Sequence, residues 1–135
     1  MSIQLSVGAR NARLDAIEAA IGVSAKLQIY TGSMPASCAT APSGTKLVEI
    51  TLASDWAANA SSGAKSFNNT PLSSTGLAGG TAGYFRIVDS AGTTCHLQGT
   101  VTATGGGGDM TIDNTSIANG QAVNVTSFTL TDGNA

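Results

Sequence analysis

The sequence predicts a mainly β fold, and three observations support this prediction. Short runs of alternating apolar and polar residues, rich in Val, Ile, Thr and aromatic side chains, recur along the chain. Clusters of Gly, Pro, Ser and Asn separate these runs, as is typical of the turns between strands. One stretch near the N-terminus has helical spacing instead. We therefore expect an antiparallel β-sandwich, jelly-roll-like, with one short N-terminal α-helix.

Length and composition indicate one domain of structural type. The chain has 135 residues, enough to bury a core of its own, and we divide it into an N-terminal arm and helix (1–22) and a β-sandwich domain (23–135). Only 10% of the residues are charged and 4% aromatic, which is unusual for a metabolic enzyme. All six Lys and Arg lie in residues 1–86 beside four acids, whereas 87–135 holds four Asp and neither Lys nor Arg. This distribution argues against a nucleic-acid-binding surface.

The sequence also bears on location and on its two cysteines. No apolar run approaches the roughly 20 residues that a membrane-spanning helix needs, and the first residues do not resemble a secretion signal. We therefore expect synthesis in the cytoplasm of the producing cell and no membrane partner. Cys38 lies in a loop-like stretch and Cys95 is predicted to face the core, so we expect two reduced thiols, although the sequence leaves their pairing open.

The N-terminal region is predicted to contain an arm followed by a helix. Residues 1–7 alternate in the manner of an extended arm or edge strand, and residues 9–21 have helical spacing, with Gly22 suited to end the helix. A helix this short needs a docking surface, either its own sheet or a partner subunit. The residues expected to contact a partner are Ile3, Leu5, Val7, Arg10, Arg13, Leu14, Ile17 and Ile21.

The middle of the chain is predicted to contain strands and loops. Two stretches rich in Pro, Gly, Ser and Thr, residues 32–45 and 71–81, are predicted to be loops. Trp56 is expected to fill the core or to anchor a loop. The strands predicted before residue 80 span 26–31, 46–52 and 65–68.

The densest alternation predicts a β-hairpin over residues 83–102, turning at Ser90-Ala91-Gly92. If Asp89 faces Thr93, one row of side chains faces the core, with Ile87 opposite Cys95 and Phe85 opposite Leu97. The other row forms an exposed polar face, where a binding site would be sought first. That face consists of Tyr84, Arg86, His96 and Gln98.

The C-terminal part is predicted to form two further strands, over residues 109–113 and 121–131. In the last strand Val125 and Phe128 lie on opposite faces of a regular strand. Either both faces are buried or a β-bulge lies near Thr126-Ser127.

The residues do not indicate an enzyme. The single histidine, His96, excludes metal sites built from several histidines. No nucleophile-elbow pattern surrounds a serine. We therefore expect no catalytic activity, no cofactor and no metal.

The chain resembles a family of small proteins encoded by tailed bacteriophages and prophages, and the resemblance covers nearly the full chain. The segments that carry it are residues 9–22, 80–99, 108–117 and 128–133. The closest assigned role is that of capsid cement or decoration proteins, whose jelly-roll subunits bind the outside of the shell. This resemblance implies a virion protein on the capsid surface, assembled in the host cytoplasm, with the major capsid protein as partner and a homodimer or homotrimer as the bound form. It assigns no functional residues.

Two alternative functions remain open from the sequence. The first is a structural subunit of the tail, of a fibre or of the head–tail joint. The second is a β-sandwich module that binds a carbohydrate or a receptor. The second alternative would use the predicted polar face of residues 84, 86, 96 and 98, whereas a cement protein would use the arm, the helix and the loop 32–45.

Overall fold

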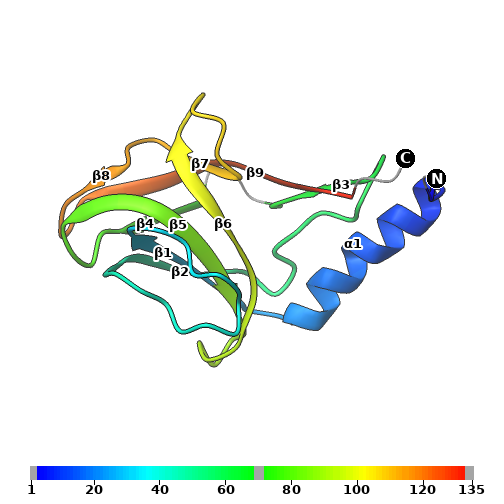
Figure 1. Cartoon of the computed structure of the whole chain (residues 1–135), viewed down its shortest axis with the longest axis horizontal. Helices are drawn as coiled ribbons and strands as arrows, with labels where there is room; N and C mark the ends of the chain where they lie inside the picture. Colours follow the sequence, from blue (N-terminus) through cyan, green and yellow to red (C-terminus); the bar gives the residue numbers. More distant parts are fainter. Residues whose placement is uncertain (1–2, 69–71, 133–135) are drawn as a thin grey trace.

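The computed structural model describes residues 3–68 and 72–132 and confirms a mainly β chain with one helix (Figure 1). The elements, in chain order, are α1 (Val7–Ile21), β1 (Lys26–Thr31), β2 (Lys46–Thr51), β3 (Ala64–Ser66), β4 (Leu72–Thr75), β5 (Gly80–Val88), β6 (Cys95–Ala103), β7 (Met110–Ile112), β8 (Ser116–Ile117) and β9 (Ala122–Thr131). None of the described helices is long and apolar enough to cross a membrane.

The strands form one curled, open sheet, so the predicted sandwich or jelly roll is not confirmed. The strand order is β2-β1-β5-β6-β7-β9-β3, with β4 added to β9 and β8 to β5. All pairs are antiparallel except β6 with β7. The curl brings β2 towards the β4 region (Figure 1): the Leu77 N–H donates to the Leu47 carbonyl at 2.7 Å, and the Ser74 hydroxyl to the Glu49 carbonyl at 3.2 Å.

The concave side of this sheet encloses one apolar core. Phe128 of β9 lies at its centre, with its ring centroid 5.5 Å from that of Phe85 and 4.8 Å from that of Phe67. Trp56 packs on Phe67 at 6.0 Å and donates its indole N–H to the Gly22 carbonyl at 3.1 Å. Trp56 thus fills the core, one of the two roles that the sequence predicted, and it also anchors the end of α1.

The hairpin of β5 and β6 is confirmed, but its predicted register is wrong. Ile87 pairs with Leu97, not Cys95, and a one-residue shift then places Val88 opposite Cys95. A bulge of one residue inverts the direction of the side chains beyond it. Cys95 therefore leaves the core-facing row in which the sequence had placed it.

Of the two alternatives left open for the last strand, the structure contains the bulge. Thr111 of β7 pairs with Ser127, whereas the next residue, Ile112, pairs with Val125, so Thr126 is the extra residue. The bulge allows both Val125 and Phe128 to be buried on the same side.

Residue 71 lies outside the described residues, and the prediction of a loop from 71 to 81 is wrong for residues 80–81, which begin β5, and for residues 72–75. These residues form β4, which pairs antiparallel with β9 from Leu72 opposite Val125 to Thr75 opposite Ala122. The segment has one large apolar residue and three hydroxyl residues, so it has weak local β propensity. Its strand conformation depends on backbone pairing with β9.

Helix α1 begins earlier than predicted and shortens the arm. Its first residue is Val7, and the Ser6 hydroxyl accepts a hydrogen bond from the Ala9 N–H at 3.1 Å, which satisfies a free donor of the first turn. The described part of the arm is therefore residues 3–6, while residues 1–2 lie outside the described residues. The helix ends as predicted at Gly22, whose φ is +89°.

A buried lysine fastens α1 to the sheet. Lys65 of β3 has a side chain only 5% exposed, and its ammonium group contacts Asp15 and Glu18 of the helix at 2.7 Å each and the Ala58 carbonyl at 2.8 Å. Burial lowers the pKa of Lys65, but its bonds to the two carboxylates outweigh burial and leave the pKa raised. The ammonium group donates hydrogen bonds to Asp15 and to the Ala58 carbonyl and forms an ion pair with Glu18, so α1 is held at one end of the molecule beside β3 (Figure 1).

Replacing this lysine should loosen the helix. In Lys65→Met, two carboxylates lose their cation, and we expect the free energy of unfolding to fall by about 2–3 kcal/mol in urea titrations. Lys26→Met is the matched control, because Lys26 is 30% exposed and lies 3.7 Å from Glu49; it should cost about 0.5 kcal/mol. Equal losses in the two variants would contradict the role given to Lys65.

Candidate functional site

The predicted polar face is present but largely covered. Tyr84 and Arg86 are 0% and 3% exposed, and Gln98 is half-buried, which leaves only His96 exposed. The prediction of an exposed face is therefore wrong for Tyr84 and Arg86. These residues are not available as they stand for a carbohydrate or a receptor.

The cover is the segment 33–45, which connects β1 to β2 and lies over the outer side of β5 and β6. The Tyr84 hydroxyl donates to the Ser43 carbonyl at 2.6 Å and accepts from the Ser43 N–H at 3.0 Å. Gln98 donates to the Pro35 carbonyl at 2.9 Å. At Gly44 the backbone of the segment lies against Thr31, the last residue of β1. A Cβ at this position would collide with the Thr31 carbonyl, and the φ of +77° also favours glycine.

Arg86 is the charged group beneath this segment. Its Nη2 donates to the carbonyls of Cys38 and Thr40 at 2.8 Å each and more weakly to that of Ser37 at 3.4 Å. Among the ion pairs of the described residues, none includes Arg86. A buried cation without a carboxylate must be stabilised by other dipoles. The backbone carbonyls of the segment 33–45 have this role.

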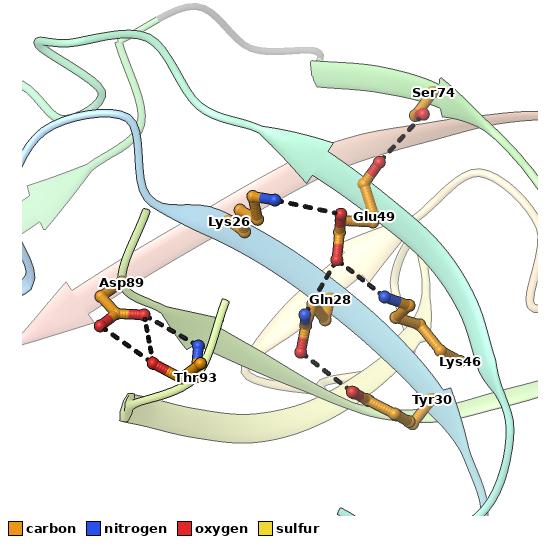
Figure 2. Close-up of polar contacts among 8 residues, drawn as sticks. All are labelled: Lys26, Gln28, Tyr30, Lys46, Glu49, Ser74, Asp89 and Thr93. Atoms are coloured by element: carbon orange, nitrogen blue, oxygen red, sulfur yellow. Dashed lines mark hydrogen bonds and ion pairs between the residues drawn. The ribbon is translucent and has the colours of Figure 1, made fainter. Parts of the chain in front are cut away.

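Polar groups continue across the same side of β1 and β2 (Figure 2). Glu49 accepts from Lys46 at 2.8 Å and from Gln28 at 2.9 Å, and Lys26 lies 3.7 Å away. Bonding to Lys46 is the largest effect on the Glu49 carboxyl and holds its pKa below the ordinary value of 4.5. Gln28 in turn accepts a hydrogen bond from the Tyr30 hydroxyl at 2.9 Å.

Tyr30 and Tyr84 form the aromatic part of this layer. Their rings are stacked, 5.3 Å apart and within 9° of parallel. Burial raises the pKa of the Tyr30 hydroxyl, so it remains a neutral donor at physiological pH. Hydrogen bonds thus join the sheet to the segment 33–45, while two buried atoms of the layer, Arg86 Nε and Gln98 Oε1, have no hydrogen-bond partner.

The residues predicted to contact a partner divide into two groups. Leu14 and Ile21 are buried in this chain, and Ile17 packs against the core, so the prediction of partner contacts is wrong for Leu14 and Ile21. The reason is that α1 docks on its own sheet. By contrast, Ile3 and Val7 are 72% and 49% exposed. Leu5 lies between them and is half-buried.

The two arginines of α1 contact the end of β9. Arg13 Nε lies 3.1 Å from a carboxylate oxygen of Asp132, and Arg10 Nη1 donates to the Asp132 carbonyl at 3.2 Å. The side chain of Arg13 remains 57% exposed. Both residues therefore fix the helix while they border the exposed N-terminal end.

The structure does not bring together a metal site in residues 3–68 and 72–132, where no group of three His, Cys, Asp or Glu has suitable geometry. A cavity of about 360 Å³ lies beside Lys65. The charge of the Lys65 ammonium group is already paired with the carboxylates of Asp15 and Glu18, so Lys65 does not offer this cavity an unpaired cation for a ligand.

The sequence did not predict that the segment 33–45 covers the sheet, nor that Lys65 pairs with Asp15 and Glu18 of α1. The segment 33–45 covers Arg86 with backbone carbonyls, which every residue possesses and no sequence pattern marks. A partial signal was present, because Arg86 lies between Phe85 and Ile87 in a strongly apolar run. Lys65 gave no signal, since its partners Asp15 and Glu18 are distant in sequence.

Comparison with protein-family models, with curated proteins and with solved structures gives no match for this chain.

The Tyr84 hydroxyl should stabilise the segment 33–45. Tyr84→Phe removes two hydrogen bonds to Ser43 and should lower the free energy of unfolding by about 2 kcal/mol, with faster hydrogen exchange of the Ser43 amide. Tyr30→Phe, which removes one hydrogen bond to Gln28, should lower the free energy of unfolding by about 1 kcal/mol. The backbone amide of Ser43 should stay protected from exchange in this variant. Unchanged exchange at Ser43 in Tyr84→Phe would show that the hydroxyl does not hold the segment.

Glu49 should contribute to stability in a pH-dependent manner. Its folded-state pKa is lowered, so its contribution is complete above the ordinary value of 4.5 and is lost as pH falls through the lower folded-state value. Glu49→Gln should therefore cost about 1 kcal/mol at pH 6 and less at pH 3, as measured by urea unfolding at both values. An equal cost at both pH values would mean that the carboxylate charge is unimportant.

Proposed function

We propose that this chain is a structural protein of a phage virion, which binds the outside of the capsid and stabilises it. The observation that carries the proposal is the exposure of two large apolar side chains, Ile3 and Val7, at the N-terminal end of α1. Ile3 and Val7 are four residues apart in the sequence, and exposed apolar patches mark surfaces for association. The resemblance of the sequence to phage virion proteins supports the same proposal.

The support for this arm is rigid. Lys65 and Trp56 fasten α1 at its middle and at its end. The arm is therefore attached to a fixed helix, which limits the conformational freedom that it loses on binding. Because Leu14 and Ile21 are buried, the contact surface that we propose is smaller than the sequence predicted: it consists of residues 3–7 with Arg10 and Arg13 at its border.

A small contact is sufficient for a protein bound in many copies. Two apolar side chains give a modest affinity, but contacts made jointly by the subunits of an oligomer add through effective concentration. We accordingly propose the major capsid protein as partner, a homodimer or homotrimer as the bound form, the capsid surface as location and the host cytoplasm as the place of assembly. The jelly-roll-like arrangement belongs to this proposal as well, with the curled sheet as its support.

A role in the tail, in a fibre or at the head–tail joint would use the same N-terminal surface and differs in where the protein is found. The receptor-binding alternative is less favoured, because Tyr84 and Arg86 are covered by the segment 33–45. No enzyme activity is part of the proposal.

Adding the purified protein to phage shells that lack it should test the proposal. Electron cryo-microscopy should show density at repeated positions over the capsid, and the shells should resist heat better. The double variant Ile3→Asp/Val7→Asp should bind about 100-fold more weakly, because two apolar side chains lose their burial.

The matched control is Leu77→Asp, which changes an apolar side chain that is 52% exposed and lies outside the arm. It should bind as the unchanged protein does. Density confined to the tail or to one vertex would favour the joining role and refute the cement role. Equal binding of the double variant and the Leu77 variant would refute the N-terminal contact.

A further inference from the structure

The two cysteines lie on the two sides of the same interface. Cys38 belongs to the segment 33–45 and Cys95 is the first residue of β6, and both are half-buried free thiols. Both line one cavity of about 370 Å³ beneath the segment, together with Arg86. Residues far apart in the sequence are thus brought together where the segment meets the sheet.

Two features of the fold produce this arrangement. The bulge in the hairpin places Cys95 opposite Val88, two residues along β5 from Arg86 and outside the core-facing row. Arg86 in turn holds the Cys38 carbonyl at 2.8 Å. The backbone on either side of the thiol pair is therefore fixed by hydrogen bonds.

The electrostatics of Cys38 agree with a close thiol neighbour. Burial raises the pKa of the Cys38 thiol to about 11, and the nearby Cys95 thiol adds to this effect, while the Arg86 guanidinium opposes it. Cys38 is therefore protonated at neutral pH and is not a free reactive thiolate. Cys38 therefore stays reduced until an oxidant reaches Cys38 and Cys95.

We propose that Cys38 and Cys95 form an intramolecular disulfide on oxidation, which fastens the segment 33–45 covalently to β6. With a small disulfide such as oxidised glutathione, one cysteine attacks as thiolate and releases one glutathione thiol. The other cysteine then displaces the second glutathione from the mixed disulfide. In total the protein loses two hydrogen atoms, and one oxidised glutathione becomes two reduced molecules.

The disulfide would add a covalent link where hydrogen bonds hold the cover on the sheet. The segment 33–45 is held by Tyr84, Arg86 and Gln98, each through backbone groups. A covalent link between residues 38 and 95 restricts the unfolded chain and keeps the cover closed over the Arg86 charge. This inference does not depend on the proposed function.

The test is to oxidise the full chain and locate the product. The reduced protein is incubated with oxidised glutathione at pH 8, quenched with iodoacetamide under denaturing conditions and examined by intact-mass and peptide mass spectrometry. We expect a monomer that has lost two hydrogen atoms, takes up no iodoacetamide and contains a linked Cys38–Cys95 peptide pair. Its Tm should exceed that of the reduced form by about 10 °C.

The controls are Cys38→Ser and Cys95→Ser. Each should yield only a mixed disulfide with glutathione, and its Tm should not rise on oxidation. The inference is overturned if the unchanged protein gives disulfide-linked dimers, gives mixed disulfides alone or keeps two thiols that react with iodoacetamide. The unchanged protein decides the matter by itself, so a variant that folds poorly does not weaken the test.

Discussion

The burial of Arg86 is the constraint on which much of the outer side of this sheet depends. A guanidinium that is 3% exposed needs partners, and these are backbone carbonyls of the segment 33–45. The segment must therefore lie close over β5 and β6, and the other contacts accompany that position. Tyr84 bonds Ser43, and Gln98 bonds Pro35. A loop without regular structure thereby becomes a fixed layer of the fold.

The parts of the fold that were predictable have local signals. The alternation of residues 26–31 indicates the first strand, and the change of parity between Val125 and Phe128 limits the last strand to two alternatives, of which the bulge is present. The bulge opposite Val88 had no such signal, because moving Cys95 from one row to the other leaves no apolar residue out of place. β4 was missed because its conformation comes from pairing with β9, far along the chain.

The candidate site was predictable only in composition. The sequence placed Tyr84, Arg86 and Gln98 correctly in one row but not their burial, because the groups that cover them belong to the backbone. It likewise identified α1 but not its docking surface. That surface depends on Lys65, whose carboxylate partners Asp15 and Glu18 come from a different part of the sequence. Contacts of long sequence separation decided both features.

The closure between β2 and the β4 region affects how copies of the chain meet at high concentration. An edge strand normally offers a row of free backbone groups to which a second chain adds by hydrogen bonding. Here Leu77 and Ser74 use the carbonyls of Leu47 and Glu49 on that edge. A neighbouring copy therefore finds this edge obstructed, and runaway sheet growth into fibrils is disfavoured there.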